Sequence, residues 1–374
     1  MGISSRLGTA GFLARRHLMS HRRRWFGNVA AVGVAVMLVL FVAGVVHWMR
    51  NSTTAYLHHV QAPLMVTQQG VSNFLLSQST LPPPALSAVG NVSGVASVVP
   101  IVTISGVIGN GATKVPVLVI GHPAGQAGPW QIHSGTDAVT GGEVVVDRGL
   151  ATTLGLHVGS AVTLLGRPLR VTGLSDGTNA AGIFLCFVTS ATAQAITGSD
   201  VASYGLVHLD AQASVAAVGA AIDGIPGIHA LTPGALASSD GRMVNASFLQ
   251  PTEIFLIVCY VIGLIIASIV LYTSTVEHAR DFAVIKALGA RTRFVYISAL
   301  FEAAILTICG FVVGWLLANG LSMGFNHFRP VILAQMPAIL VLETFVILGL
   351  VNLLATIPPV VHLRRVDPQE VFKA

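Results

Sequence analysis

The sequence predicts a helical membrane protein with four transmembrane helices and an extracytoplasmic α+β domain inserted between helices 1 and 2. Charged residues make up only 9% of the 374-residue chain, and its mean hydropathy is +0.77. A soluble domain carries about 25% charged residues, so much of this chain must lie in lipid. Four apolar stretches are each long enough to cross a bilayer as a helix, and the long segment between the first two contains no such stretch.

Residues 1–24 form a basic amphipathic segment ahead of the first span. The segment holds arginines but no acidic residue, and a basic amphipathic helix beside a span favours anionic lipid over nucleic acid as its partner. The first span, 25–49, carries a tryptophan near each end, which suits the two membrane interfaces. Positive charge before this span places the amino terminus in the cytoplasm. We therefore expect a multi-pass protein of the cell (plasma) membrane with both termini cytoplasmic.

Residues 50–250 form the expected extracytoplasmic domain. Weakly helical residues before Pro63 are expected to continue the first span outward as a stalk. Strands are predicted where Val and Ile recur, and turns where Gly, Asn and Pro cluster. The predicted strands are 97–108, 114–120, 142–146, 161–165, 169–171 and 206–209, and the predicted helices are 147–154 and 215–222.

The domain offers acidic and histidine side chains, but they follow no catalytic motif that we recognise. The candidate acids are Asp137, Glu143, Asp147 and Asp176, and the candidate metal ligands are His58, His59, His122 and His133. The sequence has no H-E-x-x-H motif, and the stretch 109–114 lacks the glycine that precedes the lysine of a P-loop. We therefore expect no catalytic residue, no metal site and no cofactor bound by this chain.

The second span covers 253–275, and a charged cytoplasmic segment, 276–293, follows it. Within the span, Gly263 and Ala267 form a small-x3-small pair that favours close helix contact. The segment after it keeps apolar residues at helical spacing and so predicts a short amphipathic helix. A helix of this kind either lies in the lipid interface or docks on a soluble partner.

The third span, 294–320, carries a small residue at every fourth position, namely Gly310, Gly314 and Ala318. This spacing predicts a ridge on which another helix packs closely. Glu302 lies about two turns from the cytoplasmic end, and an acid inside a membrane is a functional candidate by default. Glu302 is also close enough to the interface to reach Arg291 or water. Two alternatives therefore remain: a functional acid inside the membrane, or an acid that pairs with Arg291 or water at the interface.

An external loop, 321–337, is expected after the third span. The fourth span, 338–359, ends at Pro358 and Pro359, because proline cannot donate the backbone hydrogen bond that a helix needs. The cytoplasmic tail, 360–374, contains an N-cap pattern that begins at Asp367.

The cytoplasmic segment resembles a known family motif. The run Glu277-x3-Asp281-Phe282-Ala283-x2-Lys286-Ala287-Leu288-Gly289-Ala290 is similar to the coupling segment of the FtsX-like, or MacB-type, permeases, which is close to E-x3-E-[IF]-[GA]-x2-[RK]-A-[LI]-G-A. The stretch 143–164 resembles the core of the MacB-type periplasmic domain, with Ser160 where the family usually has Asp. Residues 358–370 resemble the family's carboxyl end.

This resemblance implies the membrane subunit of a type VII ABC transporter. A separate ABC ATPase, carrying ATP and Mg, would contact the residues Glu277, Arg280, Asp281, Phe282, Ile285, Lys286, Leu288 and Gly289. Because such ATPases work as pairs, a second permease copy or a paralogue is expected. The expected function is to transmit ATP-driven change to the outer domain, for export or extraction of a lipophilic or peptide-like substrate. Two alternatives remain: a mechanotransmitting regulator of an outer partner such as a cell-wall hydrolase, and a membrane-anchored receptor with no ATPase.

Overall fold

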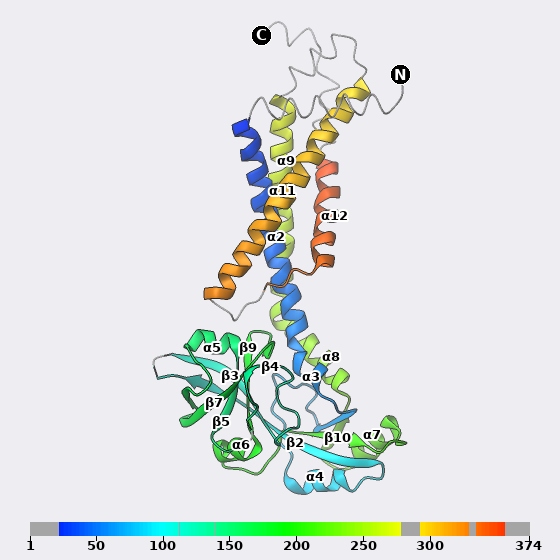
Figure 1. Ribbon diagram of the computed structural model, residues 1–374. Helices are drawn as coiled ribbons and strands as arrows, with labels where there is room; N and C mark the ends of the chain where they lie inside the picture. The colour runs from blue at the N-terminus through cyan, green and yellow to red at the C-terminus, as the bar shows by residue number, and fades with distance from the viewer. Residues whose placement is uncertain (1–21, 112, 139, 278–291, 329–333, 356–374) are drawn as a thin grey trace. The chain divides into compact units, whose positions relative to one another are not determined.

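The computed structural model describes residues 22–111, 113–138, 140–277, 292–328 and 334–355 (Figure 1). These residues divide into a helical unit and an α+β unit. The helical unit takes in the described residues of Met1–His47, Pro251–Gly324 and Ala334–Ala374, and the α+β unit takes in those of Trp48–Gln250 and Phe325–Leu333. The α+β unit therefore corresponds closely to the segment between the first two apolar stretches.

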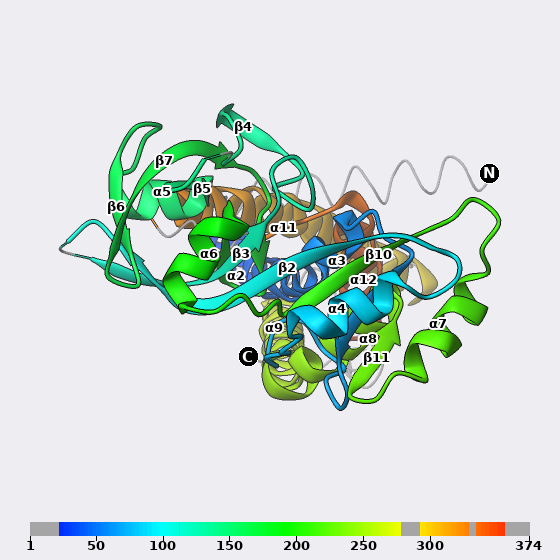
Figure 2. The same cartoon turned by 90° about the horizontal axis from the view of Figure 1, so that it is seen from below.

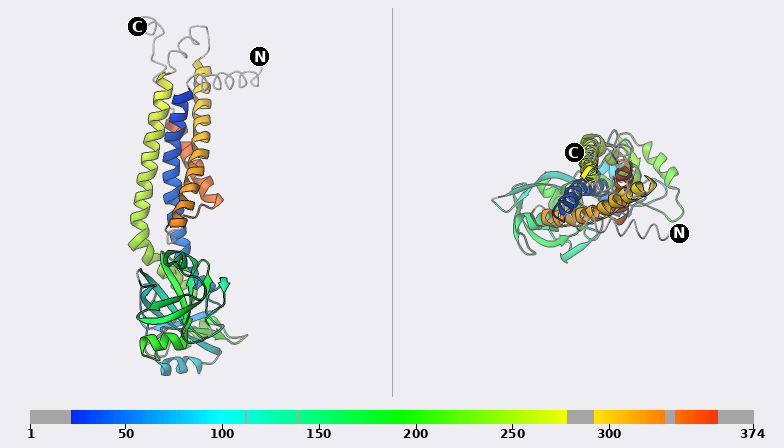
Figure 3. Two further views of the ribbon diagram at one scale, coloured as in Figure 1. Left: turned by 60° about the vertical axis from the view of Figure 1, so that its left-hand side comes forward. Right: turned by 90° about the horizontal axis from the view of Figure 1, so that it is seen from above.

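Long helices make up the helical unit: α2 (Arg22–Thr53), α9 (Gln250–Glu277), α11 (Thr292–Phe328) and α12 (Ala338–Ala355). In the described part of the chain, 3 helical stretches are long and apolar enough to cross a membrane: Trp25–Thr53, Pro233–Val270 and Ala303–Phe325. The apolar part of α12, Ala338–Leu350, is shorter. Figure 3 shows α2, α9 and α11 side by side, in blue, yellow-green and orange. Side chains buried between these helices are apolar, among them Val36 and Leu40 of α2 and Phe311 of α11.

Two helix ends differ from the expected ones. The sequence predicts an external loop from residue 321, but α11 continues to Phe328. Asn319 and Gly320 favour a helix end, but they lie inside α11, and no proline interrupts the chain before Pro330. Helical structure also begins before the expected second span, since α8 (Pro233–Val244), a π-helical turn (Asn245–Leu249) and α9 follow one another without a loop.

An 11-stranded mixed sheet forms the centre of the α+β unit. Its strands run in the order β11-β1-β10-β2-β3-β9-β5-β7-β4, with β6 beside β2 and β7, and β8 beside β9. The strands are β1 (Leu64–Gln68), β2 (Val95–Gly109), β3 (Lys114–His122), β4 (Ile132–Gly135), β5 (Glu143–Asp147), β6 (Ala161–Leu164), β7 (Arg167–Ser175), β8 (Asn179–Ala180), β9 (Ile183–Thr189), β10 (Tyr204–Leu209) and β11 (Ile228–Leu231).

Strand β2 joins two lobes of the sheet, because its two halves pair with different strands. Its first half pairs antiparallel with β10, and its second half pairs antiparallel with β3. The tip of β2 also pairs with β6. The strands β2, β3, β9, β5, β7 and β6 consequently close into a ring. Figure 2 shows β2 running along the domain between β6 at one end and α7 at the other.

Short helices cover both lobes of the sheet. In the lobe of β1, β10 and β11, α4 (Pro83–Gly90) and α7 (Val215–Asp223) bury Val89, Val218 and Ile222 against the strands. In the ring, α5 (Arg148–Leu154) and α6 (Ser190–Thr197) bury Leu150 and Ala193. Between the lobes, α3 (Ala55–His59) and α8 contribute side chains to a third apolar cluster.

The stretch from Glu143 to Leu164 folds as the sequence predicts. Strand β5 leads into α5, and the Oδ1 atom of Asp147 caps that helix by accepting a 2.8 Å hydrogen bond from the backbone N–H of Gly149. Gly155 ends the helix at φ 65°, and Gly159 turns the chain toward β6 at φ 95°. Positive φ suits glycine, which has no Cβ to clash. The predicted strands 97–108, 114–120 and 206–209 and the helix 215–222 are confirmed as well.

Candidate functional site

The segment that resembles a coupling motif lies almost wholly outside the described residues. Glu277 is the last residue of α9. Arg280, Asp281, Phe282, Ile285, Lys286, Leu288 and Gly289 fall within 278–291, which the structure does not describe. Their proposed contact with an ATPase therefore rests on the sequence.

The small residues of α11 lie where this helix meets α2. A Cβ atom built on Gly310 would lie 2.5 Å from Val32 Cγ1, and one built on Gly314 would lie 2.5 Å from Val36 Cβ. These distances are far below van der Waals contact, so only glycine permits this approach. Ala318, one turn further along, is fully buried.

The contact between α2 and α11 depends on a third glycine, which sequence analysis did not assign to helix packing. A Cβ atom built on Gly33 of α2 would lie 2.9 Å from Val313 Cγ1. The residues four positions before and after Gly33 are Val29 and Met37, so the sequence gives no small-x3-small signal at Gly33. On α9, Gly263 faces Ala35 Cβ and Val39 Cγ2 of α2, each 3.8 Å from its Cβ position, and Ala267 is buried.

Two acidic residues lie on the helices of the expected third and fourth spans. Glu302 belongs to α11, but its side chain lies outside the described residues. Glu343 belongs to α12 and its side chain is exposed. Sequence analysis missed Glu343, although an acid within an apolar stretch was the signal that singled out Glu302.

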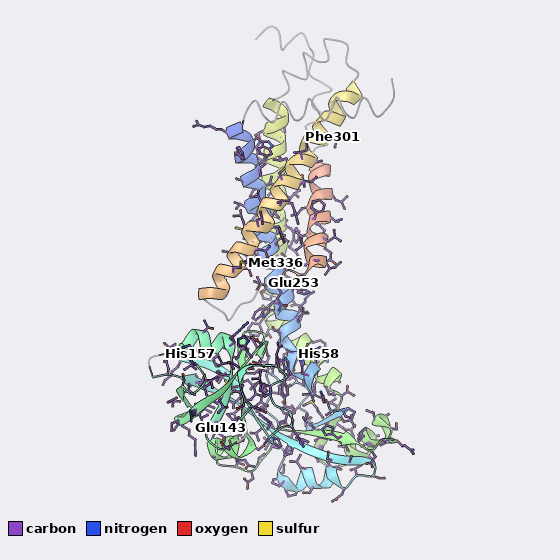
Figure 4. The ribbon with its side chains drawn as sticks, viewed as in Figure 1. His58, Glu143, His157, Glu253, Phe301 and Met336 are labelled. Atoms are coloured by element: carbon purple, nitrogen blue, oxygen red, sulfur yellow. The ribbon has the colours of Figure 1, made fainter. Side chains whose placement is uncertain are left out.

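The acids and histidines considered for catalysis or metal binding are scattered over the α+β unit. Figure 4 shows His58 and Glu143 in separate parts of the domain. Asp176 forms an ion pair with Arg148 (2.8 Å), and its carboxylate lies 3.0 Å from His133 Nδ1. Asp147 caps α5 and binds Thr178. Among the described residues, no three His, Cys, Asp or Glu side chains lie close enough together to hold a metal ion.

The sequence also contains two G-x-S-x-G pentapeptides that sequence analysis missed. Gly320–Gly324 lies inside α11, where no strand precedes the serine. The other pentapeptide is Gly173–Gly177. In serine hydrolases this pattern places an exposed serine on a turn between a strand and a helix. Here Ser175 is fully buried at the end of β7, and its Oγ lies 2.6 Å from Thr178 Oγ1. The chain continues into β8 and not into a helix. The pentapeptide therefore does not form a nucleophile site.

A cleft of about 500 Å³ opens within the α+β unit. Residues from distant parts of the chain line it: Tyr56, His59, Val60, Gln61, Val99, Gly125, Gln126, Ala127, Gly128, Pro129, Trp130, Asp137, Leu206 and His208. On one wall the rings of His59 and Trp130 stack with their centroids 4.4 Å apart. Sequence analysis did not find this cleft, because its residues come together only in the folded domain.

The loop between β3 and β4 forms one side of the cleft and has an unusual backbone. Ala127 has φ 59°, a conformation that residues with a Cβ rarely adopt. The hydroxyl of Tyr56 donates a 3.1 Å hydrogen bond to the carbonyl oxygen of Ala127 and so holds the loop in place. Because Tyr56 is buried, the pKa of its hydroxyl is raised well above the ordinary value, which keeps it a donor at all physiological pH values.

Family models match both parts of the chain. The model of the MacB-like periplasmic core domain matches residues 25–225, and the model of the FtsX-like permease C-terminal region matches residues 253–368. The first match covers more than half of the chain, and the second covers α9, α11 and α12.

Known proteins are similar to this chain over nearly its full length. An uncharacterised ABC transporter permease of Mycobacterium tuberculosis H37Rv is 25% identical over 367 residues, which are 96% of this chain and 99% of that protein. A second such permease of the same strain is 23% identical over 365 residues, with the same coverage of 96% and 99%. An uncharacterised ABC transporter permease of Mycobacterium bovis is 25% identical over 367 residues, again covering 96% and 99%.

Solved structures with some likeness to the chain are extracytoplasmic domains. The periplasmic region of MacB from Actinobacillus actinomycetemcomitans is 14% identical and has a TM-score of 0.37, covering 47% of this chain and 91% of its own. The extracellular domain of the ABC-type transporter YknZ from Gram-positive bacteria is 13% identical, with a TM-score of 0.36 and coverage of 46% and 100%. The family assignment rests on the two family models, whose matches are residues 25–225 and 253–368. By these matches the chain belongs to the family of permeases with a MacB-like periplasmic core domain and an FtsX-like C-terminal region.

Proposed function

We propose that this chain is the membrane subunit of an ABC complex and transmits ATP-driven conformational change to its extracytoplasmic domain. A separate cytoplasmic ATPase, which holds ATP and Mg, supplies the motion through residues 277–290. The observation that carries this proposal is the similarity to ABC transporter permeases over 96% of the chain. The sequence contains no P-loop, so ATP has to be bound by another subunit if it is bound through that motif.

In this proposal α12 is the fourth span, and both termini are cytoplasmic. The apolar sequence runs on from Ala338 to Pro359, which at 1.5 Å per residue gives about 33 Å, enough to cross a ~30 Å hydrocarbon core. The amino-terminal segment 1–24, which carries several arginines, then lies against anionic lipid on the cytoplasmic side. Two copies of the chain, or one copy and a paralogue, face the paired ATPase subunits.

The proposed action is transmission of force, with export or extraction of a lipophilic or peptide-like substrate as its result. Continuous helical structure supports it, because α2 runs from Arg22 to Thr53 and the helical stretch of α8, the π-helical turn and α9 runs from Pro233 to Glu277. The buried side chains of the helical unit are mostly apolar, with Ser322 and Thr344 as buried polar exceptions, and an aqueous path would need polar groups to line it. The role of a regulator for a cell-wall hydrolase is less supported, because the full-length relatives are ABC transporter permeases.

The coupling proposal predicts that Phe282→Asp and Gly289→Trp abolish the stimulation of ATP hydrolysis in the co-isolated ATPase. The aspartate would place a charge on the apolar stripe of the segment, and the tryptophan would prevent the left-handed turn that ends the helix. Val284→Asp is the matched control, since it adds the same charge at a position that the motif leaves open and that lies on the opposite face of the predicted helix from Phe282. ATPase activity of the complex in lipid nanodiscs is the measurement, and membrane insertion of each variant is checked by fractionation.

Stimulation by Phe282→Asp and Gly289→Trp at the level of the unmodified chain would contradict the assignment of 277–290 as the coupling segment. Equal loss of stimulation in Val284→Asp would contradict the role of the apolar stripe, because the effect of Phe282→Asp would then be one of charge alone.

A further inference from the structure

The cleft in the α+β unit is lined by an acidic side chain but, in the described part of the domain, by no lysine or arginine side chain. Asp137 is the one acidic residue among the described residues that line the cleft. An anionic ligand would therefore find no lysine or arginine to pair with. The carboxylate is partly open to solvent, at 22% exposed. Its Oδ1 accepts a 2.8 Å hydrogen bond from the backbone N–H of Ala138, and a carboxylate has room for about four such bonds.

A buried histidine lies next to Asp137. His122 is completely buried, and its Nδ1 lies 3.0 Å from the carbonyl oxygen of Pro123. A carbonyl can only accept, so Nδ1 carries the proton of this hydrogen bond. The Nε2 atom has no hydrogen-bond partner and lies 3.6 Å from Asp137 Oδ1. The carboxylate of Asp137 thus receives no hydrogen bond from His122, and Gly128 is packed against both side chains.

The rest of the lining suits an apolar body. Tyr56, Val99 and Leu206 are buried side chains, and the stacked rings of His59 and Trp130 add a flat wall. The volume of about 500 Å³ falls in the range of small-molecule sites, about 300–1,000 Å³. The strained conformation of Ala127 is fixed at this same cleft, and such strain concentrates at binding and catalytic sites.

We propose that this cleft binds an organic cation, with an ammonium group against Asp137 and an apolar body against the wall of Tyr56, Leu206 and the His59–Trp130 pair. The site lies entirely within the α+β unit. Binding of a ligand in this cleft does not require the ATPase. The proposal therefore goes beyond force transmission and is tested independently of it.

The test uses the full chain in lipid nanodiscs and three probes with the same apolar body: 4-phenylbutylamine, 4-phenylbutanol and 4-phenylbutyrate. Isothermal titration calorimetry, corrected with empty nanodiscs, gives each affinity. We expect the amine to bind at least tenfold more tightly than the alcohol, and the carboxylate to bind most weakly. Asp137→Asn should weaken the amine about tenfold and leave the alcohol unchanged, since a tenfold change corresponds to about 1.4 kcal/mol for the lost charge interaction.

Asp176→Asn is the matched control, because Asp176 has the same 22% exposure but pairs with Arg148 and does not line the cleft. Affinities of the three probes that agree within threefold would overturn the proposal, as would the tightest binding by the carboxylate. Equal weakening of the amine by both variants would also overturn it. The comparison of the three probes needs no variant, so it decides the question even if Asp137→Asn does not fold.

Discussion

Asp147 shows how much a single buried acid does in the α+β unit. Its side chain is 5% exposed, and besides capping α5 it accepts hydrogen bonds from the backbone N–H (3.1 Å) and hydroxyl (2.9 Å) of Thr178. One carboxylate thus links β5 and α5 to the turn before β8. The sequence suggested that Asp147 begins the helix, but it could not indicate the bonds to Thr178, which depend on the fold.

Replacing Asp147 with alanine is expected to destabilise the domain. The variant loses the cap on Gly149 and leaves the backbone N–H of Thr178 buried without a partner, while the Thr178 hydroxyl keeps Ser175 Oγ 2.6 Å away. Together these losses cost about 2–4 kcal/mol. Urea unfolding of the full chain, followed by tryptophan fluorescence, measures this loss. Asp210→Ala is the control, because the Asp210 side chain is exposed. A loss in Asp147→Ala no larger than in the control would contradict the role given to this carboxylate.

The same residue predicts a pH dependence. Burial raises the pKa of Asp147, although the hydrogen bonds from Thr178 and Gly149 oppose this shift. The folded state therefore holds the proton more tightly than the unfolded chain does. The stability gained in this way is complete below the unfolded pKa, about 4, and is lost as pH rises through the folded pKa.

Comparison with Asp147→Asn isolates this effect, because asparagine keeps the capping oxygen and cannot titrate. We expect the stability of the unmodified chain, relative to Asp147→Asn, to fall as pH rises from 4 to 8. Unfolding free energies measured across this range test the prediction. Parallel pH profiles for the two proteins would show that Asp147 titrates alike in the folded and unfolded chains.

At the scale of elements, the glycines of α2 and α11 set the distance between two apolar helices. Gly310→Ile is expected to lower the free energy of unfolding by about 1–3 kcal/mol, because the added atoms overlap Val32. Gly320→Ile on the same helix is the matched control, since no atom lies within 4 Å of its Cβ position. Thermal unfolding in nanodiscs compares the two. Equal midpoints would mean that α2 and α11 do not approach each other this closely in the membrane.

Elements with a regular pattern were predictable, and elements defined by their surroundings were not. The hairpin of β2 and β3 alternates valine and isoleucine with smaller residues and ends at Gly109 and Gly111, so it could be predicted. Strand β9 was missed, although it lies in the middle of the sheet between β3 and β5. Its residues, Ile183–Thr189, are nearly all buried and show no alternation, and a short apolar run of this kind does not distinguish a strand from a helix.

The cleft could not be predicted from the sequence for a related reason. Its walls come from α3, β2, the loop after β3, and β10, which are far apart in the chain. Asp137 and His122 were noted only as candidate acid and candidate metal ligand. Their importance comes from their 3.6 Å separation and from the orphaned Nε2 atom, and neither can be deduced from spacing along the chain.

At the scale of the whole molecule, the separation into an apolar helical unit and an α+β unit could be predicted from hydropathy alone. The number of spans is less completely determined, because the described apolar part of α12 is shorter than the other three stretches. Partner subunits leave no mark on a single chain beyond the motif at 277–290 and the family to which the chain belongs. On the basis of that motif and that family, we propose that a separate ATPase acts on this permease.

The most direct test of that claim is to isolate the full chain gently from its native membranes and to identify the proteins that accompany it by quantitative mass spectrometry. The account predicts an ABC ATPase in stoichiometric amount, which a crosslinker placed in 276–291 joins covalently to this chain. Absence of any ATPase, even after crosslinking through that segment, would contradict the account and leave a membrane-anchored receptor as the better description.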